Sequence, residues 1–164
     1  MSKFPNLKKP YDFIASLGGI GLIPFAPGTF GSVFASVFFV IIAHFIKIIN
    51  MIMLIIFVVF FAIWVCEKAS SNLLEKDHKS IVIDELAGMW VALVPVLYVT
   101  SDQNERIFYA CLAFIFFRFF DILKPYPISY FDKKYKNGFG IVLDDIIAGI
   151  FAGIFSVTIV IFVI

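Results

Sequence analysis

Long apolar runs separated by short polar stretches dominate the pattern of this chain. Their lengths suit helices that cross a bilayer, because a hydrocarbon core of ~30 Å needs about 20 helical residues. The run from Phe30 to Cys66 is too long for one such helix and is interrupted only by Lys47 and Asn50. It therefore predicts two helices joined by a tight turn. In all we expect five spans, at approximately residues 30–49, 51–66, 81–99, 107–123 and 141–164.

This pattern predicts an all-α, polytopic membrane protein with a single membrane domain over residues 1–164. Period-2 alternation is absent, so helices remain the way to satisfy backbone polar groups in lipid. Residues 1–17 are expected to form a polar lead-in, with a short interfacial helix around Tyr11–Leu17. Residues 18–31 are rich in Gly and Pro, and we expect either a short re-entrant helix or an extended loop there.

The basic residues indicate the orientation of the spans. If the N-terminus is cytoplasmic, only Lys47 and Arg106 lie on the opposite side, and Arg118 lies within the fourth span near its cytoplasmic end. An excess of Lys and Arg on the cytoplasmic side is typical of membrane proteins, so the bias supports both the orientation and the five-span count. The cytoplasmic set is Lys3, Lys8, Lys9, Lys68, Lys76, Lys79, Lys124, Lys133, Lys134 and Lys136.

The composition agrees with lipid as the surrounding medium. The chain is 62% hydrophobic and 15% charged, with a mean hydropathy of +1.01, whereas soluble domains are about 45–50% apolar and about 25% charged. The two cysteines, Cys66 and Cys111, lie in apolar runs without a spacing motif, so we expect reduced packing residues. The net charge of +1 identifies no partner, and no nucleic-acid partner is expected.

Acidic residues gather at the predicted cytoplasmic ends of three spans. Carboxylates near spans are rare and mark functional sites, and closely spaced ones repel unless a cation neutralises them. Oxygen ligands suit Mg²⁺ or Mn²⁺ rather than zinc. Charge also costs little at the headgroup level, but that alternative does not account for two acidic pairs and a fifth acid on one side. We therefore predict that these residues are catalytic metal ligands: Asp84, Glu85, Asp121, Asp144 and Asp145.

Two cations accompany these acids. Arg118 and Lys124 are spaced three residues to either side of Asp121, and such cations supply counter-charge for a phosphate ester. We predict that both bind substrate phosphate. Snorkelling to the membrane surface is the alternative for Lys124.

Three further residues are predicted to serve the same site. Thr29 and Ser32 precede or open the first span, where a helix N-terminus favours an anion, so either would bind phosphate or cap the helix. His78 would donate a proton or bind phosphate, or else be a solvated loop residue. The chain lacks a Cys-x5-Arg loop and a DxDx[TV] motif, which disfavours two other phosphatase chemistries.

Taken together, these motifs resemble the bacterial phosphatidylglycerophosphatase A family. The similar blocks occur in the family's order and cover most of the chain from residue 18 onward. At the acidic positions the chain shows no departure from the family pattern. The blocks are residues 26–32 (APGTFGS), 78–85 (HKSIVIDE) with 88–90 (GMW), 118–125 (RFFDILKP) with 127–128 (PI), and 138–145 (GFGIVLDD) with 148–149 (AG).

The resemblance implies Mg²⁺-dependent removal of the terminal phosphate of phosphatidylglycerophosphate, a membrane phospholipid, to give phosphatidylglycerol. It also implies a place in the bacterial inner membrane, and the charge pattern puts the site at the cytoplasmic face. Attack on phosphorus by water and attack by an Asp carboxylate, giving an aspartyl-phosphate, both stay open. The alternative function is a cation transporter or channel with a carboxylate-lined site.

Overall fold

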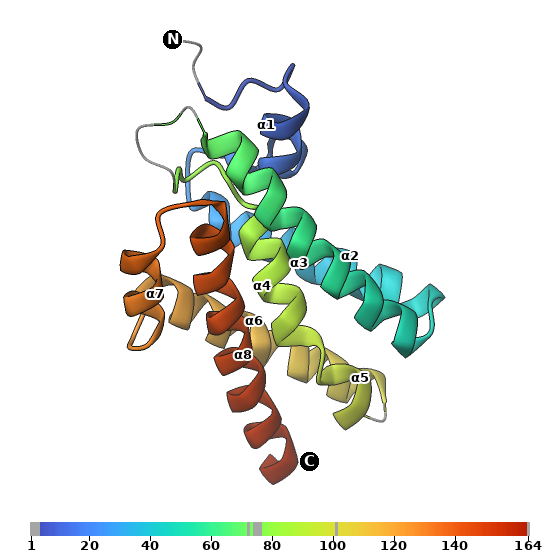
Figure 1. Ribbon diagram of the computed structural model, residues 1–164. Helices are drawn as coiled ribbons and strands as arrows, with labels where there is room; N and C mark the ends of the chain where they lie inside the picture. The colour runs from blue at the N-terminus through green and yellow to red at the C-terminus, as the bar shows by residue number, and fades with distance from the viewer. Residues whose placement is uncertain (1–3, 72, 74–76, 101, 164) are drawn as a thin grey trace.

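The computed structural model describes residues 4–71, 73, 77–100 and 102–163, which contain helices and no strand (Figure 1). Parts of the predicted lead-in (residues 1–3), of the cytoplasmic lysine set (Lys3 and Lys76) and of the last predicted span (Ile164) lie outside the described residues. The elements are α1 (Pro10–Ala15), the 3₁₀ helix η1 (Leu17–Leu22), α2 (Pro27–Phe45), α3 (Ile48–Ser70), α4 (Ile83–Leu93), α5 (Val96–Val99), α6 (Gln103–Leu123), α7 (Ile128–Lys134) and α8 (Gly138–Val163).

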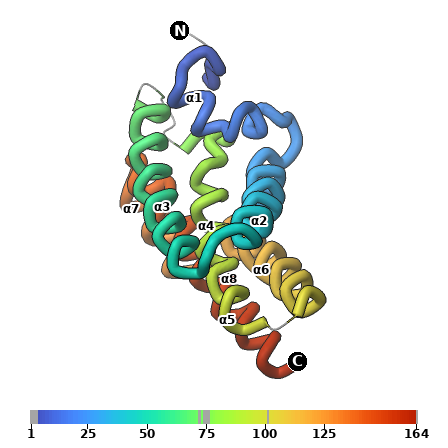
Figure 2. Tube along the Cα trace, turned by 90° about the vertical axis from the view of Figure 1, so that its right-hand side faces the viewer, coloured from blue at the N-terminus to red at the C-terminus, as the bar shows by residue number. Residues whose placement is uncertain are grey.

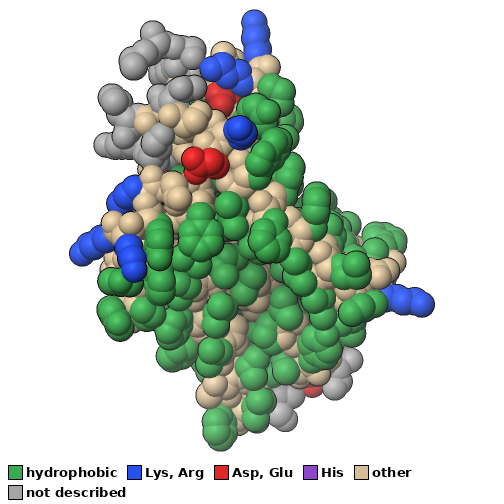
Figure 3. All heavy atoms as spheres, in the orientation of Figure 1, with side chains coloured by type: hydrophobic (Ala, Val, Ile, Leu, Met, Phe, Trp, Pro, Cys, Tyr) green, Lys and Arg blue, Asp and Glu red, His purple; other side chains and the backbone are tan. Residues whose placement is uncertain are grey.

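Three of these helices, α2, α3 and α8, are long and apolar enough to cross a membrane. Large apolar side chains project outward from them, among them Phe45, Phe60 and Phe162, which are 79%, 68% and 84% exposed. Figure 3 shows such side chains over most of one face, with Lys and Arg gathered mainly at its upper and left margins. An apolar surface this extensive suits lipid. The all-α membrane fold is thus confirmed, while the five spans and the cytoplasmic N-terminus stay predictions.

The helices differ from the prediction by a few residues at several ends, and three differences change the path of the chain. The expected span 81–99 is broken into α4 and α5 around Val94–Pro95, because proline has no N–H to continue the helical bonding. The turn between α2 and α3 lies at Ile46–Lys47, a few residues earlier than expected, where both residues are extended. The polar stretch 124–140, expected to be a loop, contains the short helix α7.

The segment expected to be re-entrant or extended is partly helical. A short helix, α1, is observed near the position expected for Tyr11–Leu17, while its place at the membrane interface stays a prediction. The 3₁₀ helix η1 follows it, with Gly18 and Gly19 at positive φ. Helix α2 then begins at Pro27, a favourable first residue because its fixed φ is helical and its missing N–H needs no partner. The N-terminal end of α2 is therefore an ordered part of the helix array.

Helix α8 packs closely against both α4 and α6 and so fixes how these two helices are positioned relative to one another along their lengths. A Cβ on Gly149 of α8 would lie 2.2 Å from the carbonyl oxygen of Gly88 in α4, so the two backbones are nearly in contact. The buried Tyr109 hydroxyl of α6 donates to the carbonyls of Ala92 (3.0 Å) and Gly153 (3.3 Å). In Figures 1 and 2, the N-terminal ends of α4 and α8 lie near the C-terminal end of α3.

Candidate metal and phosphate site

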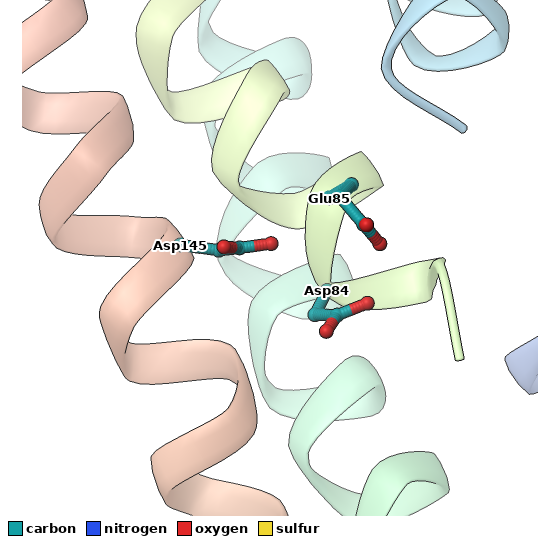
Figure 4. Close-up of side chains that lie close together, drawn as sticks. All are labelled: Asp84, Glu85 and Asp145. Carbon is teal, nitrogen blue, oxygen red and sulfur yellow. The ribbon is translucent and has the colours of Figure 1, made fainter. Parts of the chain in front are cut away.

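Three of the predicted carboxylates meet where α4 and α8 come together. Asp84 and Glu85 lie in the first turn of α4, and Asp145 projects toward them from α8 (Figure 4). One oxygen from each of these three side chains lies within 4.8 Å of the others. Asp84 and Asp145 are buried. The close packing at Gly149, one turn after Asp145, holds α8 near enough to α4 for this grouping.

The three converging carboxylates could hold a cation. Asp84 Oδ1 and Glu85 Oε2 are buried and have no hydrogen-bond partner among the described residues. A buried carboxylate oxygen without a donor is costly. Oxygen donors from three carboxylates fit Mg²⁺ or a similar hard cation, which would satisfy both orphan atoms.

Asp121 and Arg118, both on α6, lie beside the three carboxylates. Arg118 Nη1 donates to Asp121 Oδ2 at 2.6 Å, as their i, i+3 spacing allows. Asp121 in turn interacts electrostatically with Asp145, and Arg118 with Glu85. The Nε atom of Arg118 is buried and has no partner among the described residues. The guanidinium thus partly balances the acids and keeps one donor for an anion.

The start of α2 closes the site from another side. Gly28 lies so near that a Cβ there would be 2.2 Å from Glu85 Oε1 and 3.2 Å from the Arg118 Nη atoms. The buried Ser32 hydroxyl donates to the Gly28 carbonyl at 2.8 Å and accepts a long bond from Arg118 Nη1 at 3.4 Å. The segment predicted to bind phosphate therefore does reach the acids, and Ser32 contacts Arg118.

Asp144 belongs to a neighbouring group instead of the three-carboxylate cluster. Its carboxylate accepts a hydrogen bond from Lys124 Nζ, which also donates to Asp132 Oδ1 at 3.0 Å. Burial acts to lower the pKa of Lys124, but the charge of Asp144 and hydrogen bonds to Asp144 and Asp132 outweigh it and raise that pKa. The ammonium group is thus held in its charged form beside the cluster, where a phosphate would need it.

Asp132, which the sequence analysis did not select, lies beside Lys124. It lies on α7, inside the stretch that was expected to be a loop, and it contacts both Lys124 and, at 3.8 Å, Lys136. The signal in the sequence was weak, since an acid among lysines in a polar segment usually lies in solvent. Only the fold of α7 back toward α8 brings it to Lys124.

Two predicted residues, His78 and Thr29, make no hydrogen bond or ion pair to the cluster among the described residues. The Nδ1 atom of His78 accepts the backbone N–H of Ser80 at 3.2 Å, and its ring packs edge-on against Phe4. Thr29 lies in the first turn of α2, half-buried, and its side chain has no hydrogen bond to a described residue. A role for either in proton transfer or phosphate binding stays a prediction.

Comparisons with known proteins agree with the resemblance drawn from the motifs. The model of a family described as phosphatidylglycerophosphatase A matches residues 13–160. A Haemophilus influenzae protein named phosphatidylglycerophosphatase A is 37% identical over 90% of this chain and 86% of its own length. An Escherichia coli K12 protein of the same name is 33% identical over 88% of this chain and 80% of its own.

A third relative carries a different name. This Bacteroides thetaiotaomicron protein, provisionally named a phosphatidylinositol-3-phosphatase, is 32% identical over 82% of this chain and 83% of its own length. No solved structure matches the chain significantly. The family match covers nearly the whole chain and the relatives cover most of it, so we conclude that the chain belongs to the phosphatidylglycerophosphatase A family and is a phosphatase.

Proposed function

We propose that the protein hydrolyses the terminal phosphate of phosphatidylglycerophosphate to phosphatidylglycerol with Mg²⁺, at the cytoplasmic face of a bacterial inner membrane. The observation that carries the proposal is the meeting of three carboxylates, two of them with unpartnered buried oxygens, beside a guanidinium with an unpartnered Nε. A phosphate monoester dianion and a divalent cation are the pair of ligands that would satisfy both sets of orphan atoms.

Asp84, Glu85 and Asp145 would hold the metal ion, since their oxygens already converge. Asp121 lies close enough to Asp145 to complete or support this set. When bound, Mg²⁺ supplies positive charge that polarises the phosphoryl group and offsets the charge of the acids. Asp144, paired with Lys124, is better placed to fix that lysine than to bind the same ion.

The cations of the chain would bind and orient the phosphate. Arg118 is held by Asp121 and Ser32, which leaves its Nε free to donate to a non-bridging oxygen. Lys124, held between Asp144 and Asp132, adds a second fixed charge at the same level. Fixed donors that need no rearrangement stabilise a phosphoryl-transfer transition state most effectively.

The nucleophile is either water or one of the carboxylates. In the second route an Asp oxygen bonds to phosphorus as the bond to the glycerol oxygen breaks, and water then cleaves the aspartyl-phosphate. Acid quenching during a single turnover of substrate with a ³²P-labelled terminal phosphate separates the two routes. Hydroxylamine-labile ³²P on the protein would establish the carboxylate route, and its absence while phosphate is released would favour water.

The substrate assignment is tested by a direct comparison. Phosphatidylglycerophosphate and phosphatidylinositol 3-phosphate would be offered to the purified protein in identical mixed micelles, because relatives carry names for both activities. We expect kcat/KM to be higher for phosphatidylglycerophosphate. A preference for the inositol lipid would keep the phosphatase chemistry but replace the substrate.

A cation transporter or channel is the second function that the sequence allowed. The structure gathers its carboxylates with Arg118 and Lys124 near the ends of helices, whereas a pathway needs polar groups along its length. Family membership also favours a phosphatase. Cation flux into proteoliposomes without phosphate release would reverse this preference.

A further inference from the structure

An apolar groove of about 820 Å³ lies between α2 and α6, outside the site described above. Its floor is formed by Leu93 of α4 and by Val96 and Leu97 at α5, where the helix break at Pro95 changes the direction of the chain. Its walls include Val37 of α2 and Ala110 of α6. Its volume is within the ~300–1,000 Å³ range of ligand sites.

The polar groups of the groove are concentrated at one end. His44, Gln103 and Arg106 lie at the end farthest from the carboxylates, near the last turn of α2 and the first turn of α6. The other polar lining residue, Ser36, donates its hydroxyl to the Ser32 carbonyl at 2.8 Å and so is already satisfied. The groove thus has a polar head and a long apolar body.

Arg106 has no ion pair or hydrogen bond through its side chain with the described residues. The adjacent acids Asp102 and Glu105 are occupied in the capping box at the start of α6, where Asp102 accepts the Glu105 N–H at 2.9 Å. Arg106 is exposed, so its guanidinium is accessible to an anion from outside the chain. A phosphate offers two acceptors to the guanidinium fork.

The length of the groove fits one lipid tail. From Val33 to Phe45 it follows α2 for twelve residues, ~18 Å at 1.5 Å per residue. Half of a ~30 Å hydrocarbon core is ~15 Å, the depth of one leaflet. A molecule with a phosphate at Arg106 and a single-leaflet tail would fill the groove from end to end.

We propose that the groove binds a phospholipid of the leaflet opposite the carboxylate site. Its phosphate lies against Arg106, Gln103 and His44, and one acyl chain runs between α2 and α6 toward Val33 and Phe114. This site is distinct from the one that holds the reacting phosphate, since its charged end lies at the other end of α6 from Arg118. The proposal does not depend on the identity of the substrate.

The test uses full-length protein in phosphatidylcholine nanodiscs containing phosphatidylglycerol with a diazirine on its acyl chain. A diazirine near the chain terminus is expected to label residues near Val33 and Phe114, and one near the ester to label residues near Phe45 and Ile107. The reverse order would mean that the lipid enters from the carboxylate end and would overturn the proposed orientation. If lipid-facing residues on α8, such as Ile154, were labelled as strongly as the groove residues, the proposed site would be overturned.

Two matched pairs of variants accompany the labelling. Arg106→Gln is expected to reduce groove labelling about tenfold, equivalent to ~1.4 kcal/mol, while Lys47→Gln, in the nearby α2–α3 turn but outside the groove lining, leaves it unchanged. Ala110→Trp fills the groove and should abolish labelling, while Ile115→Trp, 60% exposed on the same helix, should not.

Gel filtration and thermal unfolding verify that each variant is folded. If Ala110→Trp does not fold, the labelling of Arg106→Gln alone tests the proposed site. Unchanged labelling in folded Arg106→Gln would overturn the phosphate contact. Photo-crosslinks between two protein copies through Val37 or Cys111, in place of lipid adducts, would assign the groove to a second copy instead.

Discussion

At the scale of single residues, the site depends on which charges face one another. Asp84 and Glu85 converge with Asp145, and each of the first two has a buried oxygen without a partner among the described residues. Asp144 accepts from Lys124 through one oxygen, while its buried Oδ1 has no described partner. Removing one partner of a buried pair leaves an uncompensated charge, so the two groups should respond differently to substitution. The carboxylates of the first group are expected to matter for metal binding and those of the second for holding Lys124.

Gly28→Ala is predicted to impair activity more than stability. The added Cβ would lie 2.2 Å from Glu85 Oε1 and must displace that carboxylate, and misplacing a catalytic group by about 1 Å costs roughly 100-fold in rate. We expect kcat to fall by about this factor with little change in unfolding temperature. The control is Gly153→Ala, whose Cβ meets its nearest atom at an ordinary 3.5 Å. Equal activity in the two variants would contradict the placement of Gly28 against Glu85.

The positions of the acids could be predicted from the sequence, but their grouping could not. Orientation and helix ends were enough to bring Asp84, Asp121 and Asp145 to one level, because depth along a helix follows from residue count. Which carboxylate pairs with which cation depends on the direction of each side chain and on how α7 folds back toward α8. For this reason the sequence analysis grouped five acids into one ligand set and did not foresee that Lys124 pairs with Asp144 and Asp132. The ligand set itself stays a prediction.

At the scale of helices, the contact between α4 and α8 determines whether the site exists. The glycines at this contact let the backbones approach, as small residues do where membrane helices pack. Sequence periodicity located these helices, yet α4 ends at Leu93 because Pro95 interrupts it, and α7 was hidden in a polar stretch whose short length gives little hydrophobic pattern. The fold class was therefore predictable, and several helix boundaries were not.

Gly149→Ala is predicted to destabilise the protein, unlike Gly153→Ala on the same helix face. The first would place a Cβ 2.2 Å from the Gly88 carbonyl, and overpacking of this kind costs ~1–3 kcal/mol. The second meets no atom closer than 3.5 Å and should be neutral or stabilising by up to ~1 kcal/mol through helix propensity. Thermal unfolding in one detergent measures both. Similar midpoints for the two variants would contradict the close α4–α8 contact.

At the scale of the whole molecule, the predicted topology puts the candidate site on one side of the membrane. With five spans and a cytoplasmic N-terminus, the start of α6 and the end of α7 lie on opposite sides. Single cysteines at Asn104 and Lys134, in a chain without Cys66 and Cys111, would be labelled with a membrane-impermeant maleimide. We expect external labelling only at 104. External labelling at 134, or protection of 104 until the cells are opened, would contradict the topology.

The central claim is that the convergent carboxylates hold a metal ion needed to release phosphate from phosphatidylglycerophosphate. The most direct measurement is phosphate release from this lipid in detergent micelles with Mg²⁺ and with EDTA, for the native protein, Asp84→Asn and Asp145→Asn. Asp102→Asn, at the distant start of α6, is the control.

We expect release by the native protein and the control that depends on Mg²⁺ and stops with EDTA, and a loss of about 100-fold or more in both site variants. Native-level release by folded Asp84→Asn and Asp145→Asn, or release that persists in EDTA, would contradict the account.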